Sequence, residues 1–381
     1  MGELSDEARF DEARFAAALA ALGAGPRRLR MFLDGYAPHE AWEALSAGKH
    51  RNDPDGAYRD KASPGLLDRV TAACAQGEAA VRVLGRPGYP EALAHDPQAP
   101  AVVFTLGEPA RLDRRPLVAI VGTRSATTYG LGIASEIGRG LAEAGVGVVS
   151  GLAQGIDAAA HAGAIAAADD GGPPVAVLGA ALDAPVPPAR RSLLDAVARR
   201  GAVLSELPPG TRGAPGWWFA VRNRVMAAMA HVVVVVESHL TGGSWYTVTA
   251  AAARGVTVAA VPGSVRSPAS AGTNRLLGEG AVPVRDVDDV LTALELAVAG
   301  RPDIVRPMNR TRPARLTRHA PSAVIGPVAK RVRRALDHDP APLDVVVRRT
   351  GLALGEVALA LEQLAEAGLA QAAQGCWSRS G

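Results

Sequence analysis

Cysteine is almost absent from this sequence of 381 residues, because Cys74 and Cys376 are its only two cysteines. So low a count, at so wide a spacing, excludes both a disulfide framework and a cysteine-based metal cluster. The other residues offer no metal-ligand spacing either. We therefore expect a reduced cytoplasmic protein that holds no metal.

Long apolar runs are also missing. The most apolar stretch, HVVVVV at 231–236, is far shorter than the roughly 20 residues that a membrane-spanning helix needs. The first ten residues, MGELSDEARF, lack the basic start and the apolar segment of a signal peptide. These features predict a soluble protein without a membrane partner.

Aromatic residues make up only 4% of the chain, whereas apolar residues as a whole make up 48%, which predicts cores of Ala, Val and Leu. Lysine occurs only at Lys49, Lys61 and Lys330, so almost all positive charge is on arginine. A guanidinium group forms bidentate contacts with phosphate. The net charge of +3 permits a nucleic-acid partner without requiring one.

The length of the chain predicts more than one domain. Apolar residues at helical spacing from Arg9 to Ala47, broken by LGAGPRRL at 22–29, predict two helices joined by a glycine-rich turn. We assign them to a helical module of the HhH/SAM-like type over 1–80. Such turns can present backbone amides to a DNA phosphate, and a plain packing domain is the alternative. Arginines and prolines over 301–320 predict an extended basic linker.

Between 83 and 300, short apolar runs alternate with alanine-rich helical stretches. The runs are LVAIVG (117–122), VGVVS (146–150), VAVLG (175–179), AVLSEL (202–207), VVVVVE (232–237) and VTVAAVPG (256–263). Apolar strands separated by helices are typical of a mostly parallel sheet that is covered on both faces. We therefore predict an α/β core with an extended Rossmann-like, doubly wound sheet.

The last region, 321–381, has the outline of a winged-helix domain. A helix, a turn at Gly351 and a second helix precede a short run around Leu369 that can pair with the segment of Trp377. The predicted second helix, 354–367, carries three glutamates and no basic residue, so DNA phosphates would repel it. We predict that this domain docks on protein or on its own core rather than on duplex DNA.

Four polar clusters follow predicted strands, at the end of an α/β sheet where ligands bind. In the first, VGTRSATTYG at 121–130, Gly122, Thr123 and Arg124 offer an amide, a hydroxyl and a guanidinium to an anion. Arginine replaces the middle glycine of a dinucleotide-binding loop, so we expect no nicotinamide cofactor. A plain strand-to-helix turn is the alternative interpretation.

The second cluster is SGLAQGIDAAAH at 150–161, where Gly151 and Gly155 flank a turn. Asp157 and His161 lie one helical turn apart, so we expect them to contact each other as a structural pair. A metal site would need a third ligand at close spacing, and the sequence has none there.

The third cluster, at 216–231, places Trp217, Trp218 and Phe219 before Arg222, Asn223 and Arg224. Guanidinium groups beside flat rings suit single-stranded nucleic acid, which offers phosphates and unstacked bases. The alternative is that one aromatic ring belongs to the core and one arginine pairs with Glu206 or Glu237. The fourth cluster has small and hydroxyl-bearing residues at two helix starts, which can cradle an anion. Its members are Ser244, Thr247, Thr273 and Asn274.

Taken in order, VAIVGTR, SGLAQGIDAAAH, VAVLG, LSELPPG, FAVRNR, VVVVE and GTN resemble the DNA-processing protein A (DprA/Smf) family. The resemblance implies a protein that binds single-stranded DNA without cutting it and helps to load RecA recombinase during natural transformation. It further implies a homodimer through the Rossmann-like core, no cofactor and no catalytic residue. The sequence departs from the family at Ala220, where proline is common, and at Trp245 and Tyr246, where aliphatic residues are common.

The expected DNA-binding residues combine the four clusters with this resemblance. They are Gly122, Thr123, Arg124, Gly151, Gly155, Phe219, Arg222, Asn223, Arg224, Ser244, Thr247, Thr273 and Asn274.

Two other functions remain open from the sequence. A nucleoside monophosphate phosphoribohydrolase would need a catalytic carboxylate, and Glu206 and Glu237, at strand ends, are the candidates. A transcriptional regulator acting through the winged helix is the second, and the acidic helix at 354–367 argues against it.

Overall fold

The computed structural model describes residues 6–113, 115–213, 216–299, 326–336, 341–366, 369–373 and 376–379. They form two compact units: the larger contains most of residues 6–299, and the smaller contains the C-terminal residues from 326 on. Each helix among these residues is too short or too polar to cross a lipid bilayer. The predicted basic linker, 301–320, lies outside the described residues.

The larger unit is built on one nine-stranded sheet with the order β1-β2-β6-β5-β4-β3-β7-β8-β9. Its strands are β1 (Ala80–Val83), β2 (Val102–Gly107), β3 (Leu117–Val121), β4 (Gly147–Ser150), β5 (Pro174–Leu178), β6 (Ala202–Ser205), β7 (Val232–Val235), β8 (Thr257–Ala260) and β9 (Val282–Pro283). From β6 to β9 the neighbours in this order are parallel, whereas β2 runs antiparallel to β6 and to β1. All six predicted strands are confirmed, and the sheet is mostly parallel.

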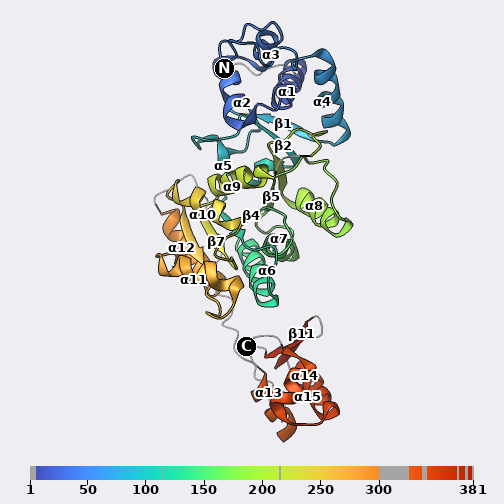
Figure 1. Ribbon diagram of the computed structural model, residues 1–381, viewed down its shortest axis with the longest axis vertical. Helices are drawn as coiled ribbons and strands as arrows, with labels where there is room; N and C mark the ends of the chain where they lie inside the picture. Colours follow the sequence, from blue (N-terminus) through green and yellow to red (C-terminus); the bar gives the residue numbers. More distant parts are fainter. Residues whose placement is uncertain are drawn as a thin grey trace. The chain divides into compact units, whose positions relative to one another are not determined.

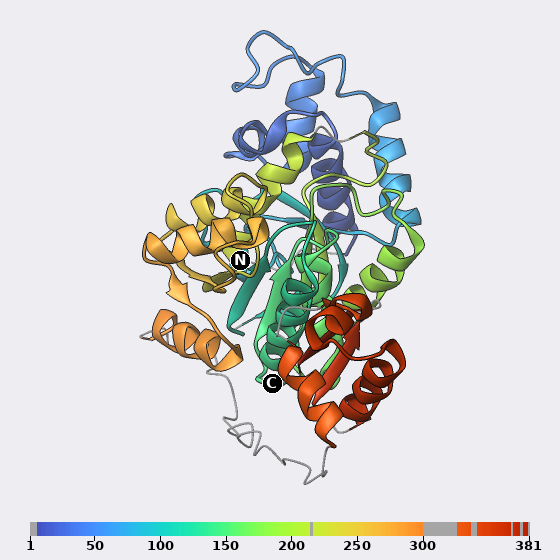
Figure 2. The ribbon, with the colours of Figure 1, turned by 60° about the horizontal axis from the view of Figure 1, so that its bottom comes forward.

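Helices cover both faces of this sheet (Figures 1 and 2). They are α5 (Glu91–Ala94), α6 (Thr128–Glu143), α7 (Ile156–Ala166), α8 (Pro188–Arg200), α9 (Trp217–Met229), α10 (Ser244–Ala252), α11 (Ala271–Gly278) and α12 (Val287–Ala297). Successive residues of β5 alternate between the faces: Ala176 packs with Leu194 of α8, whereas Val175 and Val177 pack with Met226 of α9. Both faces are therefore buried, which confirms the doubly wound fold.

The amino-terminal helices lie beside β1 and β2 at one end of the larger unit (Figure 1). They are α1 (Asp6–Ala20), α2 (Gly25–Leu33), α3 (Pro38–Ser46) and α4 (Pro64–Gln76). Three of them begin before Ala47, where we predicted two, because Gly35 adopts a φ of 73° and Pro38 starts a new helix. Phe32 of α2 and Phe104 of β2 belong to the same hydrophobic core, so these helices pack directly on the sheet.

The smaller unit contains α13 (Pro327–Ala335), β10 (Ala341–Pro342), α14 (Leu343–Thr350), α15 (Leu354–Glu366), β11 (Ala370–Ala373) and β12 (Cys376–Arg379). The turn predicted at Gly351 is confirmed, with a φ of 64°. The predicted pairing is confirmed too, because β11 runs antiparallel to β12 and Ala372 faces Trp377. The unit has its own core, which includes Val332, Val346 and Leu361.

The path of the chain through the larger sheet creates a topological switch point. After β3 the chain adds β4, β5 and β6 on one side, and it then returns to place β7, β8 and β9 on the other side of β3. Connections from the carboxyl ends of β3 and β7 therefore diverge, and they leave a crevice above these two strands. Open α/β sheets bind their ligands at this place.

Candidate functional site

A pocket of about 650 Å³ occupies the crevice at this switch point, and we call it the crest pocket. It is formed by the loops that follow β3, β4 and β7, together with the first turns of α9 and α10. The predicted site residues that line it are Gly122, Thr123, Arg124, Phe219, Arg222, Asn223, Ser244 and Thr247. Four chain segments that are distant in sequence thus meet in one cavity.

The turn after β3 presents Arg124 at the rim of the crest pocket. The amide of Thr123 donates a hydrogen bond to the carbonyl oxygen of Glu237 at 2.8 Å, which ties the turn to the end of β7. A side chain at position 122 would come within 2.7 Å of the same oxygen, so glycine is required for this approach. The exposed guanidinium of Arg124 lies over the ring of Phe219, 5.5 Å from its centroid. A ring holds this group by its π face and leaves its N–H donors available to an anion.

Arg222 lies at the bottom of the crest pocket and is only 6% exposed. Its guanidinium donates to the carbonyl oxygen of Val177, and its Nε donates to Oδ1 of Asn223 at 3.0 Å. Asn223 in turn donates to the carbonyl oxygen of Gly243 at 3.0 Å. A side chain at Gly151 would overlap the guanidinium of Arg222, so glycine at that position makes room for it.

The charge of Arg222 acts on the carboxylate of Asp157, which also lines the crest pocket. Burial raises the pKa of Asp157, and the positive charge of Arg222 opposes this shift. Burial also lowers the pKa of Arg222, and the negative charge of Asp157 opposes that shift. The pair therefore keeps an arginine in the pocket wall with part of its charge compensated, whereas Arg124 adds a further positive charge at the rim.

Hydroxyl groups line the α10 side of the crest pocket. Oγ of Ser244 lies 2.8 Å from Oγ of Ser238 in a hydrogen bond. The hydroxyl of Thr247 is buried and has no hydrogen-bond partner within the described part of the chain. Leaving a buried hydroxyl unpaired costs about 1–3 kcal/mol. A polar ligand in the pocket would satisfy it.

Partly exposed aromatic side chains line the crest pocket. Trp217 is 51% exposed, Phe219 40% and Tyr246 60%, although large aromatic rings are usually well buried. Trp217 also stacks on Trp218, with 4.9 Å between the ring centroids. These exposed rings, next to Arg124, provide surfaces on which flat ligand rings can stack.

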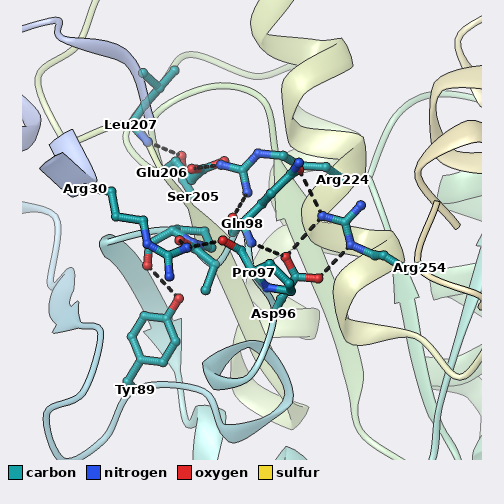
Figure 3. A network of polar contacts seen from close by, with 12 residues as sticks. Arg30, Tyr89, Asp96, Pro97, Gln98, Ser205, Glu206, Leu207, Arg224 and Arg254 are labelled. Carbon is teal, nitrogen blue, oxygen red and sulfur yellow. Dashed lines mark hydrogen bonds and ion pairs between the residues drawn. The ribbon is translucent and has the colours of Figure 1, made fainter. Parts of the chain in front are cut away.

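The structure places Arg224 outside the crest pocket, in a network that Figure 3 shows. Its guanidinium donates to the carboxylate of Glu206 at 2.5 Å and to the carbonyl oxygen of Gln98 at 2.6 Å. The alternative in which an arginine of this segment pairs with Glu206 is therefore confirmed for Arg224. Successive residues of a helix turn by about 100°, so Arg222 and Arg224 face nearly opposite sides of α9.

Three other predicted site residues support loops and do not line the crest pocket. Thr273 donates to the carbonyl oxygen of Ser270 at 3.1 Å, and Asn274 bonds both backbone groups of Gly263 at 3.1–3.2 Å. Gly155 adopts a φ of 88°, and a side chain there would come within 2.8 Å of the Arg124 carbonyl oxygen. Glycine at 155 thus lets the turn after β4 pack beneath the turn after β3.

The expected structural pairing of Asp157 with His161 does not take the form of a hydrogen bond within the described residues. Nε2 of His161 donates to the carbonyl oxygen of Val175 at 3.0 Å, and its Nδ1 has no hydrogen-bond partner in the part of the chain that the structure describes. Asp157 instead accepts hydrogen bonds from the backbone at Gly151 and Ala153. Burial lowers the pKa of His161 to about 4, so its ring is neutral at neutral pH.

Several lining residues were missed as site residues. Asp157 was assigned to a structural pair with His161, and Ser238 and His239, in the loop after β7, were not considered. Their position after a strand of the switch point was the available signal. Trp217 was recognised as a flat ring beside the arginines, and Tyr246 as a departure from the family pattern; both line the crest pocket.

A doubly wound sheet with an arginine-bearing pocket at its switch point defines a Rossmann-like protein that is suited to an anionic ligand with flat rings. The family model of DNA recombination-mediator protein A matches residues 80–295, and that of the DprA winged helix domain matches 317–375. The chain therefore belongs to the DNA recombination-mediator protein A family.

Individual relatives agree with this assignment. The putative DNA processing protein DprA of Mycobacterium tuberculosis is 40% identical over 282 residues, which cover 73% of this chain and 68% of that protein. The X-ray structure of DNA processing protein A from Streptococcus pneumoniae has a TM-score of 0.61 and 29% identity, and covers 72% of this chain and 95% of that one. A Helicobacter pylori structure, described as showing the single-stranded DNA binding mode of DNA processing protein A, has a TM-score of 0.50 and 26% identity, and covers 56% and 95%.

Proposed function

We propose that this chain binds single-stranded DNA in the crest pocket and does not cut it. The observation that carries the proposal is the pairing of Arg124 with the exposed ring of Phe219, in a pocket that the buried Arg222 also lines. Guanidinium groups contact phosphates, and exposed rings stack on unpaired bases, which is the combination that single strands need. The Helicobacter pylori relative, whose structure concerns single-stranded DNA binding, supports the same ligand.

The wider role that we propose is DNA processing during natural transformation. In this role the protein protects an incoming single strand, helps to load RecA recombinase and forms a homodimer through its Rossmann-like core. Membership of the family supports this role.

The first experiment is a fluorescence-anisotropy titration of matched single-stranded and duplex oligonucleotides across a salt series. Arg124→Ala is the variant to use, because Arg222 is buried and its removal would also affect folding. Arg139→Ala, on the exposed surface of α6, is the matched control. We expect Arg124→Ala to weaken single-strand binding and to reduce the slope of log affinity against log salt by about 0.7, the loss of one phosphate contact. If the variant bound single strands as tightly as wild type, the proposal would be wrong.

The hydrolase alternative now depends on Asp157 rather than on the two glutamates. Neither Glu206 nor Glu237 lines the crest pocket as far as the structure describes it, and Asp157 is the carboxylate that does. We expect purified protein to release no free base from nucleoside monophosphates. Release that Asp157→Asn abolishes would favour the enzyme.

The smaller unit is proposed to dock on protein rather than on duplex DNA. Leu354 and Leu359 of α15 are each 59% exposed, and Glu356 and Glu362 on the same helix are exposed too. Exposed apolar side chains suit a protein partner, and exposed acidic side chains are repelled by phosphates. Nanomolar binding of a duplex by residues 318–381 would contradict this.

A further inference from the structure

The amino-terminal helices form a cavity of their own with the edge of the sheet, and we call it the α2 pocket. Its volume is about 640 Å³, and it shares no lining residue with the crest pocket. Its wall comes from α2, from the turn after α2, and from the end of β1 with the turn after it. Arg27, which belongs to the segment LGAGPRRL at 22–29, lines this cavity. The crest pocket uses no residue of that segment.

The α2 pocket has an excess of positive charge. Its lining contains three arginines and one acid, Asp34. Asp34 forms an ion pair at 3.3 Å with Arg51, which lies outside the lining, and Arg86 forms one at 2.7 Å with Glu12. Both of these lining charges are therefore compensated. The two other arginines have no acidic partner in the described part of the chain.

These two arginines, Arg27 and Arg30, contribute in different ways. Arg30 is held in place, because its Nη1 donates to the carbonyl oxygens of Pro97 at 2.6 Å and Ala99 at 3.3 Å (Figure 3). Carbonyl groups carry no net charge, so the charge of Arg30 is not cancelled. Arg27 is exposed and makes no hydrogen bond, ion pair or ring contact with any residue that the structure describes. Its N–H donors are therefore available to an anion.

Backbone amides in the wall of the α2 pocket also lack partners. Gly35 and Gly85 line the pocket, and among the described residues their amides donate no hydrogen bond. Their φ angles of 73° and 77° favour glycine. Amides in turns with such angles can make concave sites for anions. The wall thus offers neutral donors beside the two guanidinium groups.

The α2 pocket is poorly suited to nucleobases. Tyr36 is the only aromatic residue in its lining, and the ring of Tyr36 is already in contact with other groups. The ring of His50 lies 4.6 Å from it between centroids, and the guanidinium of Arg51 lies over it at 5.2 Å. The crest pocket, in contrast, has exposed rings. The donors of the α2 pocket therefore fit phosphate groups rather than bases.

We propose that the α2 pocket is a second nucleic-acid site, which holds phosphate groups of the DNA backbone through the guanidinium of Arg27 and the positive charge of Arg30. The identity of the ligand as DNA rests on the proposed function. Phosphates are present in single strands and in duplexes alike, so this site adds affinity for both. A preference for single strands would then come from the crest pocket alone.

The test removes the free guanidinium and varies the ligand. Arg69→Ala is the matched control for Arg27→Ala, because Arg69 is exposed on α4, carries the same charge and does not line the α2 pocket. Met31→Glu is a second variant: Met31 lines the pocket and is 43% exposed, so glutamate there adds a negative charge to the wall. Fluorescence anisotropy measures binding of an oligothymidine strand, an abasic strand of equal length and a duplex. Thermal melting of each variant checks the fold.

We expect Arg27→Ala to bind the thymidine strand about eightfold more weakly than wild type at about 50 mM salt and about threefold more weakly at about 200 mM, the loss of one phosphate contact. Affinity for the abasic strand should fall by the same factors, because the pocket contacts no base. On the duplex, the slope of log affinity against log salt should fall by about 0.9. Met31→Glu should weaken binding of all three ligands, and Arg69→Ala should bind all three like wild type.

Four outcomes would overturn the inference. If Arg27→Ala and Met31→Glu, both folded, bind every ligand like wild type, no phosphate enters the α2 pocket. An equal loss in Arg69→Ala would show an effect of net charge instead. A loss on the thymidine strand alone would show contact with bases. If Arg27→Ala keeps its affinity for DNA but no longer binds pyrophosphate or polyglutamate as wild type does, the site belongs to a small anion or to an acidic protein.

The proposed function fails separately. If Arg124→Ala binds single strands like wild type whereas Arg27→Ala does not, the crest pocket is contradicted and the α2 pocket is supported. If only Arg124→Ala binds more weakly, the crest pocket is supported and the α2 pocket is contradicted. Wild type that binds none of the three ligands contradicts both proposals.

Discussion

Two groups of arginines in the larger unit differ in the groups that their guanidiniums contact. In the crest pocket, Arg124 is exposed and lies over a ring. On the other side of α9, Arg30, Arg224 and Arg254 converge on the loop at 96–99, an arrangement that we call the arginine clamp (Figure 3). Their donors are occupied by carboxylate and carbonyl oxygens of the protein itself. The same residue type thus has donors for a ligand in one region and holds the fold together in the other.

The arginine clamp joins three parts of the larger unit through one loop. Arg30 of α2 donates to the carbonyl oxygen of Pro97 at 2.6 Å, and Arg254, just after α10, donates to the carboxylate of Asp96 at 2.6 and 3.1 Å. Arg224 contributes the contact from α9. The clamp therefore holds in place the helix that carries Arg222 into the crest pocket.

Two carboxylates accept hydrogen bonds from arginines of the clamp, Asp96 from Arg254 and Glu206 from Arg224, and their pKa values shift in opposite directions. Burial raises the pKa of Asp96, but the hydrogen bonds from Arg254 and from the backbone of Gln98 outweigh it, so the net shift is downward. Burial raises the pKa of Glu206 to about 7, and Arg224 opposes this only in part. One oxygen of Glu206 also lacks a hydrogen-bond partner among the described residues. Of these two carboxylates, Glu206 is thus the one whose charge is less compensated by hydrogen bonds.

The largest effect that we expect comes from exchanging one arginine in each region for methionine. Arg224→Met leaves Glu206 buried without its cation, which should lower the free energy of unfolding by about 3–5 kcal/mol. Its affinity for single strands should change little. Arg124→Met should show the reverse, with weaker binding and a stability change within about 0.5 kcal/mol. Urea denaturation and anisotropy on both variants test this contrast. Equal effects on binding would remove the distinction between the regions.

The pH dependence of stability should report Glu206 directly. Because its pKa is raised on folding, the folded chain binds more protons than the unfolded chain between about pH 4.5 and 7. Stability should therefore fall as pH rises through this window, by an amount on the order of 3 kcal/mol. Glu206→Gln removes the group that titrates.

The measurement is the free energy of unfolding of wild type minus that of Glu206→Gln at each pH. The difference cancels His161, whose lowered pKa makes stability rise with pH between about 4 and 6.5. A difference that stays constant from pH 4.5 to 7 would contradict the raised pKa of Glu206.

A smaller effect should follow from crowding Arg222 in the crest pocket. Gly151→Ala adds a side chain that overlaps the guanidinium, which should cost about 2 kcal/mol of stability and weaken single-strand binding. Gly132→Ala, in α6, is the matched control. An added side chain there meets no atom within 4 Å, so we expect a gain of about 0.5–1 kcal/mol. Thermal melting of the two variants should move in opposite directions.

The smallest effect should come from the aromatic rim. Trp217→Ala removes a stacking surface that is half exposed, so single-strand affinity should fall about fivefold, or about 1 kcal/mol, with little change in stability. Leu240→Ala, at a 55% exposed residue that does not line the crest pocket, is the control and should bind like wild type. Anisotropy at constant salt measures both. Equal affinities of Trp217→Ala and wild type would exclude Trp217 from the interface.

Much of the fold could be predicted from the sequence. Six apolar runs identified β3 to β8, because strands buried on both faces need continuous apolar residues. The edge strands β1 and β9 were missed, and so was β2, which lies between β1 and β6: β9 has only two residues, and β1 is only partly buried. The location of the candidate pocket was predictable as well, since the carboxyl ends of parallel strands share one edge.

The roles of individual site residues depended on the tertiary structure. Arg222 and Arg224 stand in one motif and look alike in sequence, but only one faces the crest pocket. Arg224 donates hydrogen bonds to Glu206 and Gln98, which lie 18 and 126 residues away from it along the chain. The packing of the helix on the sheet decides which of its faces contacts such distant groups. Residue types and their spacing therefore indicated a candidate anion site, and packing decided which arginines line the pocket.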